Sequence, residues 1–315
     1  MKKMINKTYI EGYLYEHDLA LKVTGPNSKA PNTPFIGGSV SIATDDALLN
    51  IVKVDFTYVT GTTKKGGVNA TFTTLKNIID GAFGTVMKDG KENAVKLRID
   101  STIGLNDFYT EDRNNPGQYE LVSAKRNEGG FVHVVSGELT EDENSRNTFE
   151  CDIVITGVTH KEADPDRDLP EKAIIKGCVF NFANAMMPIE LSATNPNAIN
   201  YFESLEASPS NPTFTKVWGR QISETIVKKI SEESAFGDAK VREVKNVRKD
   251  FIITGAATEP YIWDEEGSIT AAELKECIAA RETHLATVKQ RYLEYKQSQS
   301  APMATAAPAS GGFNF

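Results

Sequence analysis

The feature that most constrains the fold is a strand-like alternation of apolar and polar side chains, which recurs from the start of the chain to about residue 262. In "NIVKVDFTYV" the side chains of Val52, Val54 and Phe56 share one face, because successive side chains of a strand point to opposite sides. Similar runs are "TYIEGYLYEHDLALKV", "AVKLRIDS", "GGFVHVVSGEL", "TFECDIVITGV", "KAIIKGCVFNF" and "DFIITGAA". They are rich in β-branched and aromatic residues and are bounded by Gly, Asn and Asp, which is typical of strands and turns.

Helical periodicity is scarce in the same region. Only "NATFTTLKNIIDGAF" and "NPNAINYFESL" show the spacing of short helices. The sequence therefore predicts a mainly β protein with some α structure, built as an antiparallel β-barrel. With 315 residues the chain is longer than one minimal barrel, so we expect either insertions or a second barrel.

The region after residue 262 changes to a helical pattern. In "SITAAELKECIAARETHLATVKQRYLEYKQS", Thr270 and Glu273 have the spacing of a capping box at a helix start. A heptad-like seam follows, made of Leu274, Ile278, Arg281, Leu285, Val288, Tyr292 and Tyr295. Docking of this seam onto the barrel is favoured over self-pairing, because so short a seam is marginal alone.

The final segment has no pattern that could form a core. "APMATAAPASGGFNF" is dominated by Ala, Pro, Ser and Gly, and is predicted to be a flexible tail. Its last aromatic residues, Phe313 and Phe315, either bind an apolar pocket of a partner or are simply the end of the chain. We thus expect a β-rich body over 1–262 with an internal boundary near 115, a long amphipathic helix over 268–297 and a tail over 298–315.

Composition limits the cellular setting. No run approaches the roughly 18–20 apolar residues that span a bilayer, so no membrane is expected. Three cysteines without a CxxC pair suit a reducing compartment, which predicts a cytoplasmic protein. The net charge of -8 does not exclude nucleic acid, since local charge sets the field at a groove. The acidic stretches at 138–150 and 161–172 are interpreted as solvated loops without an assigned role.

Signatures of catalysis and of metal binding are absent. The four histidines show no HExxH spacing, and "TGTTKKGG" lacks the order of a phosphate-binding loop. "DPDRDLPE" begins like a calcium loop, but Leu169 stands where the turn needs Gly and Ile175 stands where Glu should be. The sequence therefore predicts no enzyme, no catalytic residue, no metal and no cofactor.

Aromatic and basic residues alternate in "PTFTKVWGRQI". A strand here would place Phe214, Lys216, Trp218 and Arg220 on one face. Such a stripe suits single-stranded nucleic acid, because cations follow phosphates and aromatic faces stack on bases. The alternative is a core strand whose cations reach water. Further cations proposed to support the stripe are Lys240, Arg242, Lys245, Lys64 and Lys65.

Taken together, "YIEGYLYEHDLALKVTG", "FIGGSVSIATDDALLNIVKVDFTYV", "FTKVWGR" and the terminal "GGFNF" resemble the single-stranded DNA-binding proteins of phages and mobile elements. The resemblance implies an oligonucleotide/oligosaccharide-binding (OB) barrel and a flexible tail tipped by an aromatic residue, which recruits replication or recombination proteins. This tail departs from the family pattern, because no acid precedes Phe315.

The predicted function is sequence-independent binding of single-stranded DNA during replication or recombination, in the bacterial cytoplasm if a phage encodes the chain. The sequence does not decide between DNA and RNA, nor whether the chain forms a homo-oligomer. The alternative is a structural or assembly protein of a virion or secretion machine, for which the strands, the helix and the tail are equally suitable.

Overall fold

Eleven strands form one hydrogen-bonded sheet in the part of the chain that the structure covers. The computed structural model describes residues 4–115, 117–164, 169–232, 236, 240–265 and 268–300. The strands are β1 (Asn6–His17), β2 (Ala20–Val23), β3 (Pro34–Ala43), β4 (Ile51–Thr60), β5 (Lys96–Glu111), β6 (Tyr119–Val134), β7 (Asn147–Lys161), β8 (Lys172–Phe180), β9 (Met186–Ala193), β10 (Thr213–Glu232) and β11 (Lys240–Ala256). The helices are α1 (Ala70–Ile79), α2 (Val86–Asp89), η1 (Lys91–Asn93), η2 (Glu143–Ser145), α3 (Pro196–Ser204) and α4 (Ala271–Ser300).

The first half of the sheet closes into a five-stranded ring. β1 pairs with β3, β3 with β4, β5 with β6 and β5 with β1, all antiparallel. A short parallel contact between β4 and β6 completes the ring. α1 lies between β4 and β5 in the chain and packs Leu75 and Ile78 into the core of this ring. Five strands in this Greek-key order make an OB barrel.

The second half repeats the same arrangement. β7 pairs with β8 and β10, β8 with β9, and β10 with β11, again all antiparallel. A parallel contact between β9 and β11 closes the ring. α3 occupies the place of α1, between the third and fourth strands, and buries Ile199 and Phe202. The predicted fold class is confirmed. The sequence did not decide between one barrel with insertions and two barrels, and the structure has two.

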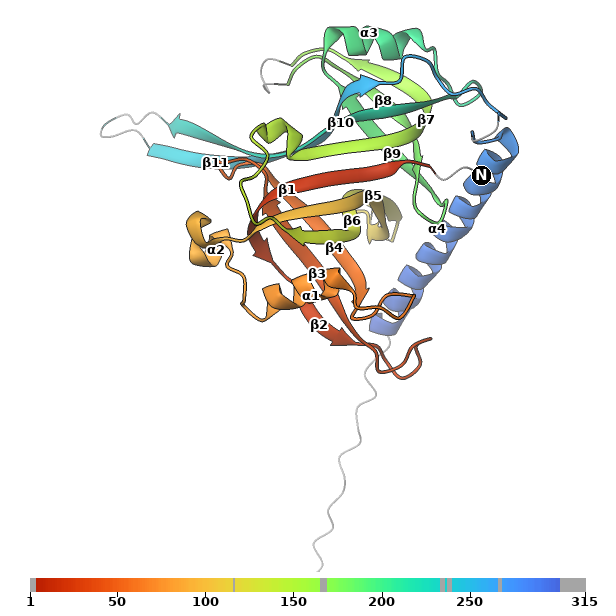
Figure 1. Ribbon diagram of the computed structural model, residues 1–315. Coiled ribbons are helices and arrows are strands. Elements are labelled where there is room, and N and C mark those ends of the chain that lie inside the picture. The colour runs from red at the N-terminus through yellow and green to blue at the C-terminus, as the bar shows by residue number, and fades with distance from the viewer. Residues whose placement is uncertain are drawn as a thin grey trace, which may run out of the picture.

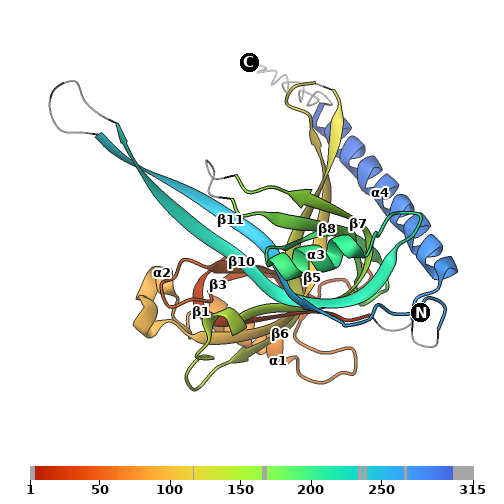
Figure 2. The same ribbon diagram turned by 90° about the horizontal axis from the view of Figure 1, so that it is seen from above.

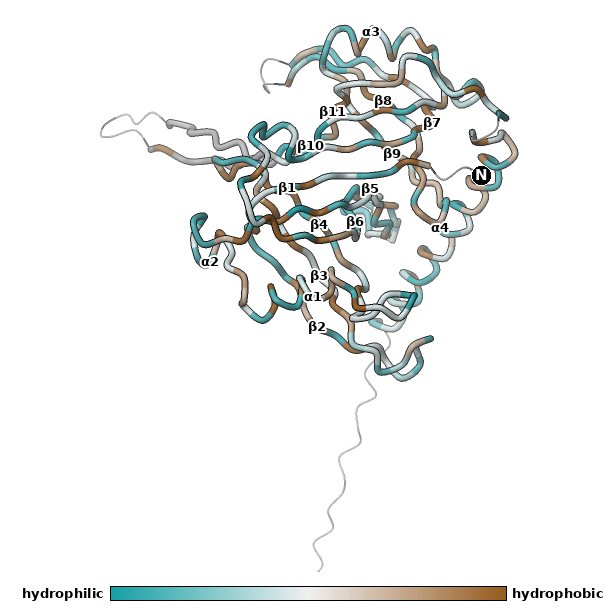
Figure 3. Tube along the Cα trace, in the orientation of Figure 1, coloured by the Kyte–Doolittle hydropathy of each residue, from teal (hydrophilic) through white to brown (hydrophobic). Residues whose placement is uncertain are grey.

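The two barrels share a junction between their first strands. Residues Asn6 to Ile10 of β1 pair antiparallel with Cys151 to Asn147 of β7, so the sheet runs without a break from one barrel into the other (Figure 1). Each barrel keeps its own core, with Leu14 in the first and Cys151 in the second. Figure 3 shows the apolar positions gathered along the strands of both barrels.

The boundary between the two barrels lies between Val134 and Asn147, later in the chain than the boundary near residue 115 that the sequence indicated. Residue 115 lies in the turn between β5 and β6, inside the first barrel. The chain leaves this barrel at the end of β6 and enters the second at Asn147. A hairpin turn and a domain boundary are both rich in Asn, Pro and Gly, so the composition at 113–117 did not distinguish them.

Helix α4 connects the two barrels from outside, as Figure 1 and Figure 2 show. Its capping box is formed, since the Thr270 amide donates to Glu273 Oε2 at 2.9 Å and the Glu273 amide to Thr270 Oγ1 at 3.1 Å. Leu274 packs against the outside of the second barrel. Tyr292 lies 5.3 Å from Tyr119, centroid to centroid, on the β5–β6 hairpin of the first barrel. The seam therefore docks on the body.

A buried ion pair fixes α4 between these two ends. Arg281 binds both carboxylate oxygens of Asp107 on β5, with one bond of 2.5 Å and another of 2.7 Å, and the two side chains are 9% and 4% exposed. Burial alone would raise the pKa of Asp107, but hydrogen bonds from Arg281 and Ser123 hold this pKa below its ordinary value.

Replacing Gly12 by Ala should open the first barrel, because a Cβ there would stand 2.0 Å from the carbonyl oxygen of Ala43 on β3. We expect a loss of about 1–3 kcal/mol or more in the free energy of unfolding, measured by urea titration. Gly25→Ala is the matched control, since its Cβ would meet nothing within 4 Å. Equal unfolding midpoints for the two variants would contradict the close β1–β3 contact.

Asp107→Asn should lower the free energy of unfolding by about 3 kcal/mol at neutral pH, since it leaves a buried Arg281 without its counter-ion. The folded pKa of Asp107 is depressed, so the pair stabilises the protein above the ordinary aspartate pKa and this contribution is lost as pH falls through the folded pKa. The difference between wild type and variant should therefore shrink below about pH 4. Lys296→Ala, which breaks the exposed pair with Glu111, should cost under about 1 kcal/mol.

Candidate nucleic-acid interface

The outward face of the continuous sheet carries its aromatic and charged side chains in rows that cross the strands. In one row, Trp218 on β10 lies opposite Glu150 on β7, and Glu150 lies opposite Lys7 on β1. These residues alternate with core residues along each strand. Val217, next to Trp218, is buried in the second barrel, whereas the Trp218 side chain is 41% exposed. The predicted alternation of this strand is thus present, with Trp218 on the solvent side.

A second row lies beside the first. Arg220 on β10 is opposite Thr148 on β7, Thr148 is opposite Tyr9 on β1, and Tyr9 is opposite Asp100 on β5. Asp100 in turn faces Phe131 on β6, whose side chain is 69% exposed. The row therefore runs from the second barrel across the β1–β7 junction into the first.

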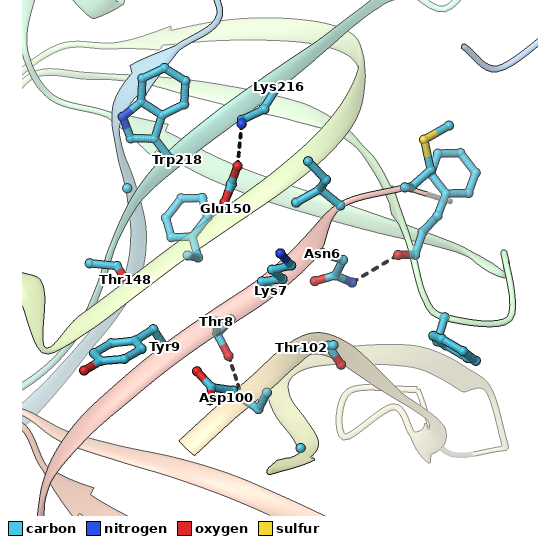
Figure 4. A pocket seen from close by; sticks show the side chains of 18 of the residues that line it. Asn6, Lys7, Thr8, Tyr9, Asp100, Thr102, Thr148, Glu150, Lys216 and Trp218 are labelled. Carbon is cyan, nitrogen blue, oxygen red and sulfur yellow. Dashed lines mark hydrogen bonds and ion pairs between the residues drawn. The ribbon is translucent and has the colours of Figure 1, made fainter. Parts of the chain in front are cut away.

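The two rows lie along a groove with a volume of about 1260 Å³ (Figure 4). Strands of both barrels line it, and Phe182 in the turn between β8 and β9 adds a ring that is 81% exposed. The charged side chains that line the groove, and the aromatic ones that reach its surface, are Lys7, Tyr9, Asp100, Phe131, Glu150, Phe182, Lys216 and Trp218. A groove with several aromatic rings and few charges offers flat apolar faces to a ligand together with a small number of polar groups.

Lys216 and Glu150 form an ion pair inside the groove, with 2.5 Å between Nζ and Oε1. The hydrogen bond to Glu150 raises the pKa of Lys216 above its ordinary value. Lys216 Nζ also lies 6.0 Å from the ring centroid of Trp218, within the range of a cation–π contact. Lys7 is exposed and has no ion-pair partner among the described residues.

The groove is therefore balanced in charge, as Lys7 and Lys216 face Asp100 and Glu150. A groove of this kind holds a ligand through its rings more than through net charge.

The expectation that Phe214 belongs to the exposed stripe is wrong. Its side chain is 1% exposed, because Tyr261 and Trp263 cover it with ring centroids at 4.6 Å and 6.0 Å. This ring faces the same side as Trp218 but cannot stack on a base. Arg220 remains on the surface at the end of its row, where it donates to the side chain of Asn144 on η2, and it does not line the groove.

Lys64 and Lys65 do not line the groove. Lys64 and Lys65 are exposed on the loop between β4 and α1. This loop follows Thr60, which pairs with Phe35 on β3, and Phe35 lies 4.8 Å from Tyr58, centroid to centroid. The two lysines thus follow a strand whose outer surface, shared with β3, carries a separate aromatic pair, and OB barrels use these two strands for oligonucleotides.

The third cationic group lies on the β10–β11 hairpin. Lys240, Arg242 and Lys245 belong to the part of β11 that extends as an arm beyond the barrels (Figure 2). Their backbone is paired with β10, and their side chains lie outside the described residues, as do Phe313 and Phe315. The contributions of these five residues stay predictions.

Six of these eight groove residues were not predicted from the sequence, namely Lys7, Tyr9, Asp100, Phe131, Glu150 and Phe182. The alternation of the first strand placed Tyr9 on one face, but nothing local indicated that β5 and β7 would flank that face. Within the described ranges, no three His, Cys, Asp or Glu side chains gather as a metal site, and no helix is long and apolar enough to cross a membrane.

The fold and the groove define a protein with two OB barrels and a shared aromatic surface. A model of the YorF family matches residues 5–291, and the chain belongs to that family. Comparison with curated proteins gives no match.

Solved structures provide two further similarities. A deletion mutant of the single-stranded DNA-binding protein from Thermus aquaticus is similar over 84% of this chain and 97% of its own, with 9% identity and a TM-score of 0.43. A replication protein A heterotrimer bound to single-stranded DNA is similar over 91% of this chain and 70% of its own, with 12% identity and a TM-score of 0.18. Both TM-scores lie below 0.5, so these two similarities carry no conclusion about the function of this chain.

The exposure of Trp218 is testable by fluorescence, since the chain has two tryptophans. Trp263 is partly covered and donates its Nε1 hydrogen to the Pro212 carbonyl at 3.2 Å. Trp263→Phe, which keeps Trp218, should emit at longer wavelength and be quenched more strongly by acrylamide than Trp218→Phe. Equal quenching of the two variants would contradict the outward position of Trp218.

Proposed function

We propose that the chain is a non-catalytic protein that binds single-stranded DNA in the groove across its two barrels. The observation that carries this proposal is the set of rings at the groove, Tyr9, Phe131, Phe182 and Trp218, with Lys7 and Lys216 between them. Stacking of a base on an aromatic ring contributes about 1–3 kcal/mol and tolerates every base. A duplex hides its base faces, so such a surface favours unpaired strands.

The phosphates would follow the cations at the edges of the rings. Lys7 has no competing carboxylate partner among the described residues, and Lys216 would release Glu150 when a phosphate approaches. Arg220 would extend the contact beyond the groove toward the β10–β11 arm, with Lys240, Arg242 and Lys245 as further contacts. Lys64 and Lys65 would act from the separate surface near Phe35.

The first test is a titration with single-stranded DNA, duplex DNA and single-stranded RNA at two salt concentrations. We expect single strands to bind more tightly than duplex, and the logarithm of the affinity to fall with that of the salt by about 0.7 for each phosphate contacted. Failure of all three to bind would sink the proposal. Concentration-dependent polymerisation without oligonucleotide would then favour an assembly protein.

Removing the Trp218 ring from the groove, together with Arg220 on the same strand beyond the groove, tests the site. Trp218→Ala combined with Arg220→Ala should weaken oligo-dT binding by roughly 5- to 100-fold at low salt, through loss of stacking and of a phosphate contact. The matched control is Tyr295→Ala with Arg291→Ala, an exposed aromatic and an exposed cation on α4. If the groove variant bound as tightly as wild type, the strand would lie elsewhere.

The finer assignment follows the family resemblance drawn from the sequence. We place the protein in DNA replication or recombination of a phage or mobile element, in the bacterial cytoplasm. Phe313 and Phe315 would contact replication or recombination proteins through mainly apolar pockets, because the tail lacks acidic residues. Pull-down of host replication proteins by the full chain, lost on truncation after residue 300, would support this role.

A further inference from the structure

Each ring on β10, β1 and β6 has a carboxylate directly opposite on the neighbouring strand. Glu150 faces Trp218, and Asp100 faces both Tyr9 and Phe131. Residues directly opposite in an antiparallel pair have Cβ atoms about 4.5–5.5 Å apart. A base stacked on any of these rings would therefore bring its polar edge close to a carboxylate.

Both carboxylates retain capacity to accept further hydrogen bonds. The Glu150 and Asp100 side chains are 37% and 45% exposed. The ion pair of Glu150 runs through Oε1, and those of Asp100 with Arg98 and His133 run through Oδ2 at 3.7 Å and 3.6 Å. Within the described residues, Oε2 of Glu150 and Oδ1 of Asp100 accept no hydrogen bond, so both oxygens can accept one from a ligand in the groove.

An ionised carboxylate only accepts hydrogen bonds. It bonds well to the exocyclic amine of cytosine, adenine or guanine. Thymine presents two carbonyl oxygens on either side of a single N–H, and these oxygens repel a carboxylate. A ring next to an acid is therefore a different environment for cytosine than for thymine, although both bases stack.

Building on the proposed function, we propose that the groove prefers bases that carry an exocyclic amine, and that Glu150 and Asp100 set this preference. The selection is a bias in base composition, because the same chemistry recurs at successive rings. This base preference would explain why two carboxylates lie beside the rings of a groove proposed to bind DNA. Without such a role, their negative charge would only weaken the binding of a polyanion.

The test compares oligomers of 5-methyldeoxycytidine and of thymidine at equal length. The two bases share ring and methyl group and differ only along the edge that a carboxylate would contact. We expect wild type to bind the methylcytidine oligomer about fivefold or more tightly. In the double variant Glu150→Gln, Asp100→Asn the ratio should fall to one or below, since amides also donate to thymine carbonyls.

The matched control is Glu138→Gln, which removes a carboxylate paired with Lys96 at 2.9 Å outside the groove, and should keep the wild-type ratio. Because the ratio is the readout, a general gain in affinity from releasing Lys216 does not affect it. Tight binding of both oligomers with a ratio near one would overturn this inference and leave the proposed function standing. A preference that survives in the double variant would also overturn it, and failure of both oligomers to bind would overturn both proposals.

Discussion

The pairing of β1 with β7 is the constraint on which the rest of the structure depends. It joins the first strand of one OB barrel to the first strand of the other, from Asn6 opposite Cys151 to Ile10 opposite Asn147. Two separate barrels would each have a small outer surface. Joined in register, they present one continuous face on which Trp218 of the second barrel and Phe131 of the first border a single groove.

Alternation along the shared strands divides their residues between two roles. Inward positions such as Ile10 and Phe149 fill the two cores, and outward positions such as Tyr9 and Glu150 form the groove. A shift of register by one residue would exchange these sets, so burial of the cores fixes the groove as well. Helix α4 reinforces the arrangement, because its buried Arg281–Asp107 pair ties the first barrel to a helix that starts on the second.

The sequence predicted what depends on local pattern. Strand alternation revealed the β class and placed Trp218 on the face opposite Val217, and Thr270 with Glu273 marked the start of α4. The burial of Phe214 could not be predicted from the strand pattern. The two rings that pack over it, Tyr261 and Trp263, belong to a segment far along the chain. The groove could not be predicted from the sequence either, because tertiary pairing, rather than a strand's own residues, determines which strands lie beside it.

We propose that unpaired bases lie across the β1–β7 junction, rather than on the outer surface of β3 and β4, where Phe35 and Tyr58 lie together. The most direct measurement is photocrosslinking with single-stranded DNA that carries 5-iododeoxyuridine, followed by mass spectrometry of the crosslinked peptides. We expect crosslinks at Trp218 and at Tyr9 or Phe131. Crosslinks confined to Phe35 and Tyr58 would contradict the account.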